Sequence, residues 1–328
     1  MEGIIHPLND DWMIGSLQFG GKRRTKDGGY NQDGVNPEDF SGDWVTPLMY
    51  DPNDQMSIYT MTNILYRSDD FGSTWTTLGN SLFSGNIQNA AIAENDSNII
   101  AVSDYNRLKI SNDGGLTFTE VSQGLPNQFI TDIAFDPNND NTIIVTYGSY
   151  GNNGQKVYIS ENQGNSWQNI THNLGNMPIR SVVIDHTENS TIYLGAEIGV
   201  YKKGMDENSW HLFNENLPNT TVMELEVVYG SNTLRGTTWG RGLWEYSLDG
   251  RENHPSILTT RISNQPTETQ PKEGLDQFVT STIQYEGELN NVYVEWYTES
   301  SSDNIQMFNS EGDCLLYTSP SPRDLMRS

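Results

Sequence analysis

The chain has 328 residues, of which 34% are hydrophobic, and a formal net charge of −25 at pH 7. This charge argues against nucleic acid and an anionic bilayer as partners, because their phosphates repel an acidic surface. No internal disulfide is possible, because Cys314 is the single cysteine. No run of 18 apolar residues occurs, so we expect no membrane insertion.

The chain begins with residues 1–7, which lack the basic and apolar regions of a signal peptide. We nevertheless expect a protein that is secreted or held on the cell surface. On this interpretation, the natural N-terminus and its export signal lie upstream of Met1.

An eight-residue pattern, Ser-x-Asp-x-Gly-x-Thr-Trp, recurs along the sequence. Its copies start at residues 25, 68, 111, 160 and 203, the first and last being incomplete. The starts lie 43 to 49 residues apart, and a near-constant period of this length predicts a repeat protein. The three clearest copies contain Ser68, Asp70, Gly72 and Trp75, then Ser111, Asp113, Gly115 and Phe118, then Ser160, Asn162, Gly164 and Trp167.

Each copy has the chemistry of a tight turn. Ser and Asp side chains hydrogen-bond nearby backbone groups, and Gly adopts a positive φ at little cost. The final Trp or Phe is then free to pack one repeat against its neighbour. We therefore assign these residues a structural role.

The motif resembles the Asp-box, or bacterial neuraminidase (BNR), repeat. In that family the box lies at the periphery of a β-propeller. The segment Gly240-Arg241-Gly242-Leu243-Trp244 is similar to the end of the last blade in sortilin-like bacterial propellers. The resemblance implies an all-β propeller and a glycosyl-hydrolase-like or sortilin-like secreted bacterial protein.

Between the motifs, the sequence predicts three strands per repeat. In one repeat these are residues 129–135, 142–147 and 156–160, and Asp136-Pro137-Asn138 is the first turn. The last repeat, residues 223–248, has three strands and no motif. We expect four-stranded blades, about five and a half in number, and therefore an incomplete ring.

The character of the sequence changes after residue 249. We expect a propeller fragment over residues 1–249, a linker and edge strand over 250–275, and a truncated immunoglobulin-like β-sandwich over 276–313. Residues 314–328 resemble the translated read-through of a sequencing adapter, and we interpret them as a non-native tail.

A column of polar residues is the candidate ligand site. Alignment of the repeats on the Asp-Pro-Asn turn places one polar residue at the same point of each innermost strand: Thr46, Gln88, Thr131, Arg180 and Glu224. One interpretation is a ring that lines the central channel, where Arg180 would hold a carboxylate or sugar hydroxyls. The other is a solvated rim without a ligand.

No catalytic residue can be assigned. The arginine signature of sialidases is absent, and among 43 acidic residues no pair stands out as the two carboxylates of a xyloglucanase-type hydrolase. Trp44, Trp239 and Trp244 either stack on sugars or pack between blades. The histidines are scattered, so we expect neither a metal site nor a cofactor, although loosely bound calcium in acidic loops stays open.

These features predict a non-catalytic scaffold that binds a glycan or an extracellular protein. The alternative is a glycoside hydrolase of the sialidase or xyloglucanase-like type, with part of its acid pair outside this chain.

Overall fold

A computed structural model describes residues 3–248, apart from 8, 80, 152–153, 188–189 and 229–230, and the backbone of six strands farther along. The chain divides into two compact units. They are Met1–Val227 with Arg235–Glu245, and Val228–Leu234 with Tyr246–Ser328.

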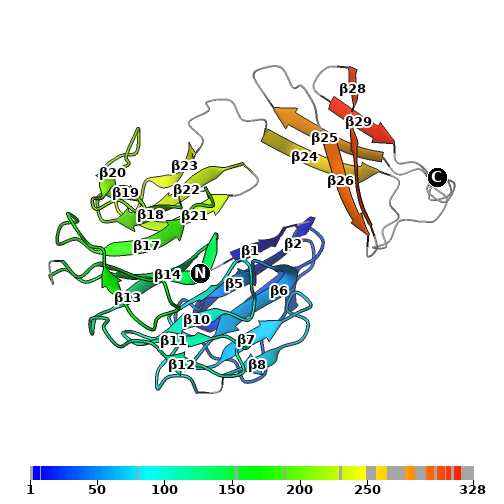
Figure 1. The fold of residues 1–328 in the computed structure, drawn as a ribbon. Helices are drawn as coiled ribbons and strands as arrows, with labels where there is room; N and C mark the ends of the chain where they lie inside the picture. The colour runs from blue at the N-terminus through cyan, green and yellow to red at the C-terminus, as the bar shows by residue number, and fades with distance from the viewer. Residues whose placement is uncertain are drawn as a thin grey trace. The chain divides into compact units, whose positions relative to one another are not determined.

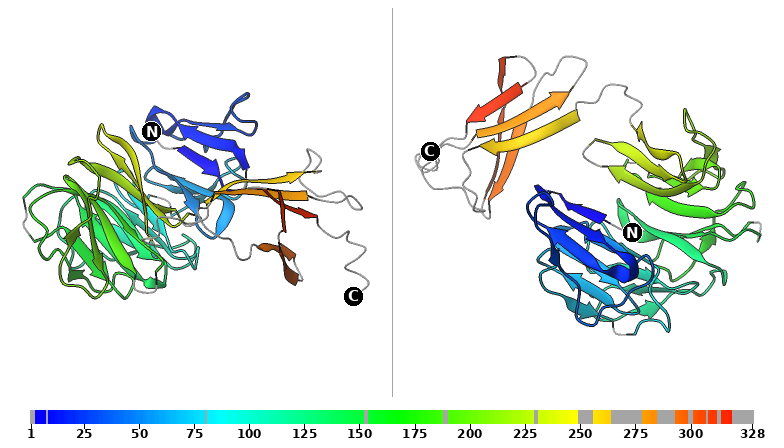
Figure 2. Two further views of the ribbon diagram at one scale, coloured as in Figure 1. Left: turned by 90° about the horizontal axis from the view of Figure 1, so that it is seen from above. Right: turned by 180° about the vertical axis from the view of Figure 1, so that it is seen from behind.

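The described strands up to Ser247 form six antiparallel sheets, the blades of a β-propeller, which follow one another in chain order (Figures 1 and 2). Blade 1 contains β1 (Gly3–His6), β2 (Asn9–Ser16), a 3-10 turn η1 (Gln18–Gly20), β3 (Lys22–Thr25) and β4 (Asp33–Gly34). Blade 2 contains β5 (Leu48–Asp51), β6 (Asp54–Met61), β7 (Leu65–Ser68) and β8 (Thr76–Leu78). Blade 3 contains β9 (Asn89–Ile92), β10 (Ile100–Ser103), β11 (Leu108–Ser111) and β12 (Thr119–Glu120).

The remaining blades continue the pattern. Blade 4 contains β13 (Ile130–Asp136), β14 (Asn139–Tyr147), β15 (Val157–Ser160) and β16 (Gln168–Asn169). Blade 5 contains β17 (Ile179–Ile184), β18 (Thr191–Ala196), β19 (Gly199–Gly204) and β20 (His211–Leu212). Blade 6 contains β21 (Val222–Val228), β22 (Thr233–Thr238) and β23 (Gly242–Ser247).

The all-β class and the propeller of four-stranded blades are therefore confirmed. The blade count differs slightly from the expected five and a half, because the first repeat, expected to be partial, has four strands. The last repeat has the three strands that its sequence predicts.

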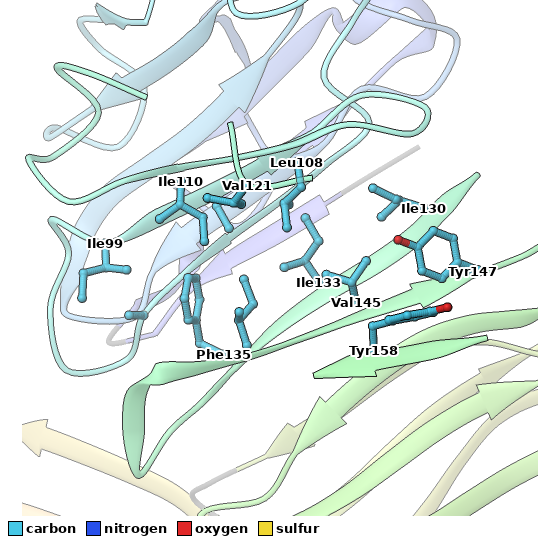
Figure 3. Close-up of a cluster of buried hydrophobic side chains, with 13 residues drawn as sticks. Ile99, Leu108, Ile110, Val121, Ile130, Ile133, Phe135, Val145, Tyr147 and Tyr158 are labelled. Carbon is cyan, nitrogen blue, oxygen red and sulfur yellow. The ribbon is translucent and has the colours of Figure 1, made fainter. Parts of the chain in front are cut away.

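Apolar side chains from neighbouring blades meet in shared cores. Between blades 3 and 4, side chains such as Leu108 and Ile110 pack against Ile133, Val145 and others (Figure 3). Full burial of such a side chain contributes about 1.5–3 kcal/mol. Similar clusters join blades 1 and 2, blades 2 and 3, and blades 4 and 5.

The register of the strands defines two faces of the propeller. The first strands β9, β13 and β17 contact one another, which makes the first strand of a blade the innermost one. Ile130 at the start of β13 pairs with Tyr147 at the end of β14, and Thr146 pairs with Val157 at the start of β15. We call the side where these ends meet the loop face, and the opposite side, with the Asp-Pro-Asn turns and the repeated motif, the turn face.

The repeated motif forms the same hydrogen-bonded turn in its three clear copies, except that in the third the Asn162 amide donates to the Ser166 hydroxyl. In the first, the Ser68 hydroxyl donates to Asp70 Oδ1 (2.8 Å) and accepts from the Gly72 N–H (2.8 Å). The Thr74 N–H and hydroxyl donate to the two Asp70 oxygens, at 2.8 Å each. Thr25 and Asp27 form a matching turn in blade 1. This geometry accounts for the motif as a turn between the third and fourth strands, and its membership of the Asp-box family stays a prediction.

The motif tryptophans also link blades by hydrogen bonds. Each indole N–H donates to a backbone carbonyl of the preceding blade, at 2.8–2.9 Å: Trp75 to Val35, Trp167 to Val121 and Trp210 to Ile170. Phe118, which has no such donor, packs in the core between blades 2 and 3.

A second set of links lies at the turns between the first and second strands of blades 2, 3 and 4, which read Asp-Pro-Asn, Glu-Asn-Asp and Asp-Pro-Asn. The asparagine amide of each turn donates to a backbone carbonyl of the following blade, again at 2.8–2.9 Å: Asn53 to Ala93, Asn95 to Pro137 and Asn138 to Thr187. The same residue types that form the turn therefore also join it to the next repeat.

For the C-terminal part of the chain, the structure describes only the backbone of six strands. A sheet of order β24-β25-β29-β28 and a hairpin β26-β27 are formed by β24 (Ser256–Ser263), β25 (Phe278–Gln284), β26 (Tyr293–Thr298), β27 (Ser301–Gln306), β28 (Phe308–Glu311) and β29 (Cys314–Thr318). The rest of the predicted linker (250–275), sandwich (276–313) and non-native tail (314–328) lies outside the described residues, so these boundaries stay predictions. Within the described part of the chain, no helix is long and apolar enough to cross a membrane.

The third copy of the motif, with Asn162 in place of Asp, suggests a test of the turn. Hydrogen bonds from Thr117 and Ser111 lower the pKa of Asp113 to about 2, so its contribution to stability is present above pH 4 and is lost as the pH falls from about 4 to 2. We expect Asp113→Asn to keep the pH 7 stability, because Asn162 makes equivalent bonds to Ser160 and Ser166, and to remove this acid-dependent loss.

The check is the urea midpoint of wild type, Asp113→Asn and Asp113→Ala at pH 7 and pH 3. Asp113→Ala should be less stable than wild type at pH 7. Equal midpoints for Asp113→Ala and wild type at pH 7 would show that the turn does not need the side chain.

Candidate functional site

The five residues of the polar column lie at or just before the starts of the innermost strands, on the loop face. Thr46 is 1% exposed and donates to the Asp43 carbonyl (3.1 Å). The Gln88 amide lies 3.4 Å from an Asp43 carboxylate oxygen. The Thr131 hydroxyl donates to the Ile179 carbonyl of the next blade (2.8 Å). These three side chains are therefore engaged in contacts within and between loops and blades.

Asp132, which the sequence analysis did not single out, lies next to Thr131 on β13. Its two carboxylate oxygens accept the backbone N–H groups of Ile133 and, from blade 5, Val182, both at 2.8 Å. Burial raises the pKa of Asp132 to about 7 against the effect of these two bonds, and the charge of Glu224 on blade 6 raises it further. This carboxyl group is therefore balanced between its two protonation states near neutral pH.

Arg180 forms a charge network across blades 4 and 5. Its Nη2 lies 3.5 Å from Glu197 Oε2, in the loop between β18 and β19. A hydrogen bond to Glu197 raises the pKa of the Tyr150 hydroxyl, which comes from the loop between β14 and β15. The buried Arg180 Nε has no hydrogen-bond partner among the described residues. The guanidinium thus keeps donor capacity beyond its ion pair.

The network continues to blade 6 through the backbone. The Thr221 hydroxyl donates to the Glu197 carbonyl (3.3 Å), and the Thr221 carbonyl accepts the Trp239 N–H (2.8 Å). Trp239 is 74% exposed and Tyr150 is 66% exposed. Tyr150 through its hydroxyl and Trp239 through its backbone N–H are therefore linked to the Arg180–Glu197 pair, and both carry exposed rings.

The three tryptophans considered from the sequence have different environments. Trp44 and Trp239 are exposed on the loop face instead of being buried between blades, so a ligand can reach their rings. Trp244 is 37% exposed on β23, and its indole N–H donates to the Arg241 carbonyl (2.9 Å).

The described residues contain no group of three His, Cys, Asp or Glu side chains arranged to hold a metal ion. Calcium in the acidic loops stays a prediction. On the loop face, blades 4 to 6 present hydrogen-bonding groups, two exposed aromatic rings and one carboxyl group whose pKa is raised to about 7.

Part of this site could have been found from the sequence. Asp132 is an acidic residue beside Thr131 of the polar column and before an apolar run on the same innermost strand, which is a usable signal. Tyr150 and Glu197 lie in loops of different length, outside the aligned column, and carry no such signal.

The proton balance of Asp132 can be measured directly. We expect the side-chain carboxyl carbon of Asp132 to titrate near pH 7 by NMR, and at a lower pH in Glu224→Gln, where the repelling charge is gone. Because its pKa is raised, this group makes the fold less stable as the pH rises from about 4 to 7. A midpoint near pH 4 in wild type would show that Asp132 is well hydrated.

Comparison with known proteins supports the fold. Residues 63–195 match the model of the family described as "Sortilin-Vps10: Sortilin, neurotensin receptor 3". No curated protein sequence matches the chain. Three solved structures share the architecture at low sequence identity, which shows the fold alone.

The GH74 enzyme of Niastella koreensis is 19% identical with a TM-score of 0.58, covering 74% of this chain and 44% of that one. The GH74 xyloglucanase of Xanthomonas campestris is 12% identical with a TM-score of 0.58, covering 93% and 57%. YCF48 of Cyanidioschyzon merolae is 12% identical with a TM-score of 0.50, covering 85% and 91%. The chain spans about half the length of the GH74 enzymes. From the six blades and the family match together, the chain contains a sortilin-like β-propeller.

Proposed function

We propose that this propeller is a non-catalytic scaffold, secreted or held on the cell surface, that binds a glycan or an extracellular protein on its loop face. The observation that carries the proposal is the network of blades 4 to 6. It links two residues with exposed rings, Tyr150 through its hydroxyl and Trp239 through its backbone N–H, to the Arg180–Glu197 pair.

This combination suits a glycan as ligand. A sugar ring offers an apolar face to an aromatic side chain and hydroxyl groups to charged donors and acceptors. The side chains of Arg180 and Glu197 are each about one third exposed, so both can reach sugar hydroxyls. The structural similarity to GH74 enzymes, one of them a xyloglucanase, makes xyloglucan oligosaccharides a reasonable first probe.

Binding without turnover fits the state of the acids. Glu197 is paired with Arg180, and both oxygens of Asp132 accept backbone N–H groups. A carboxylate held in this way is less able to act as a nucleophile or general base, although it can still accept a hydrogen bond.

Glycoside hydrolysis is the second candidate, and one observation favours it. Asp132 has a pKa near 7 and senses the charge of Glu224, and a glycosidase uses an acid of raised pKa beside a second carboxylate. In this alternative Asp132 would donate a proton to the leaving oxygen.

The proposal is tested by calorimetry with xyloglucan, cellulose-derived and host-type oligosaccharides, alongside an assay for released reducing sugar. We expect saturable binding and no release. Tyr150→Ala and Trp239→Ala should each weaken binding about tenfold, which corresponds to about 1.4 kcal/mol. Trp44 is an exposed tryptophan outside blades 4 to 6, so Trp44→Ala is the matched control and should bind as wild type does.

Two results would contradict this proposal. Affinity unchanged in both Tyr150→Ala and Trp239→Ala would remove the network from the binding site. Reducing sugar released by wild type and lost in Asp132→Asn and Glu224→Gln would establish the hydrolase instead.

A further inference from the structure

Two exposed aromatic side chains form a pair on the loop face of blades 1 and 2. Phe19, in the turn η1, is 57% exposed, and Trp44, in the segment that leads into β5, is 60% exposed. Their rings meet edge to face with centroids 5.4 Å apart. A pair of large apolar side chains kept in water marks an interaction surface.

The backbone beneath this pair is held in an unusual conformation. Phe19 has φ 62° and ψ 24°, in the left-handed region that a bulky side chain seldom adopts. The Phe19 carbonyl accepts the N–H of Gly42 (3.0 Å) from the segment that carries Trp44. A Cβ added at Gly20 would lie 2.5 Å from the Phe40 ring, so the two segments are closely packed. The pair is therefore fixed before any ligand arrives, which lowers the entropy cost of binding.

All charged side chains in the chain segment that carries Trp44 are negative. Residues 27–66 contain seven acidic residues and neither lysine nor arginine. Three of the seven, Glu38, Asp39 and Asp43, are exposed in the segment leading to β5. Asp43 accepts the Trp44 N–H at 2.7 Å, which keeps its carboxylate beside the tryptophan. The surface therefore presents aromatic rings among carboxylates, and the charge complementary to it is positive.

We propose that the Phe19–Trp44 pair and these three carboxylates bind a lysine-rich segment of a partner protein. An ammonium group over an aromatic face is attracted by the ring quadrupole, and neighbouring carboxylates strengthen that attraction. The chain uses the same contact internally, where Lys22 Nζ lies 3.8 Å from the centroid of the Phe40 ring. Among the described residues, no lysine or arginine of the chain lies over Phe19 or Trp44 in this way.

This site is independent of the proposed glycan site, because its residues come from blades 1 and 2 instead of blades 4 to 6. Loss of one site therefore leaves the other measurable in the same protein. Trp239→Ala, which should impair glycan binding, should leave this site intact.

The test measures binding of tetralysine and of its Nε-acetylated form to the full chain by calorimetry. We expect tetralysine to bind with an affinity that falls as salt is added, and the acetylated peptide to bind at least about tenfold more weakly. Trp44→Ala and Phe19→Ala leave the net charge unchanged, and each should weaken tetralysine binding at least about fivefold.

A charge-matched control separates this site from general attraction to an acidic protein. The triple variant Glu38→Gln, Asp39→Asn, Asp43→Asn should weaken binding strongly. The variant Asp10→Asn, Glu161→Gln, Asp206→Asn removes the same charge from exposed positions elsewhere and should have little effect. The urea midpoint of each variant verifies that it is folded.

Several outcomes would overturn the proposal. They are absence of tetralysine binding to wild type, wild-type affinity in both Trp44→Ala and Phe19→Ala, and equal losses in the two triple variants. Equally tight binding of the acetylated peptide, or binding of a neutral oligosaccharide that is lost in Trp44→Ala and kept in Trp239→Ala, would show that the aromatic pair recognises an uncharged ligand.

Discussion

Hydrogen bonds from side chains of one blade to backbone carbonyls of the next are the interaction on which this structure depends. A single four-stranded blade has two faces to cover and cannot bury both alone. Apolar clusters supply most of the free energy, but they are not directional. The indole N–H groups, such as that of Trp167, and the turn amides, such as that of Asn138, fix how each blade is placed against its neighbour.

The loop face derives its geometry from these links. Thr131 and Asp132 both bond to backbone atoms of blade 5, so the side chains on β13 and β17 keep a fixed relation. That relation places the Arg180–Glu197 pair, and Thr221 extends it to Trp239 on blade 6. The two binding surfaces that we propose lie on different blades of this one framework.

The sequence predicts the regular part of this structure well. The period, the turn motif and the strand predicted over residues 142–147 follow from local chemistry, which repeats with each blade. Loop contacts are different, because they depend on which groups from distant segments come within reach. Nothing local indicates that Phe19 adopts a left-handed conformation, or that Tyr150 meets Glu197, 47 positions along the chain. Asp132 could have been noticed, but its pKa depends on burial and on Glu224 from another repeat.

The most direct test of this account is hydrogen exchange, measured by mass spectrometry on wild type and on the double variant Asn138→Ala, Trp167→Phe. The variant removes two bonds from blade 4 to blade 5 and one from blade 4 to blade 3, and it leaves the strands of blade 4 unaltered. If these bonds hold neighbouring blades together, amide protection must fall in β9–β12 and β17–β20 as well as in blade 4. Unchanged protection in the neighbouring blades would contradict the account.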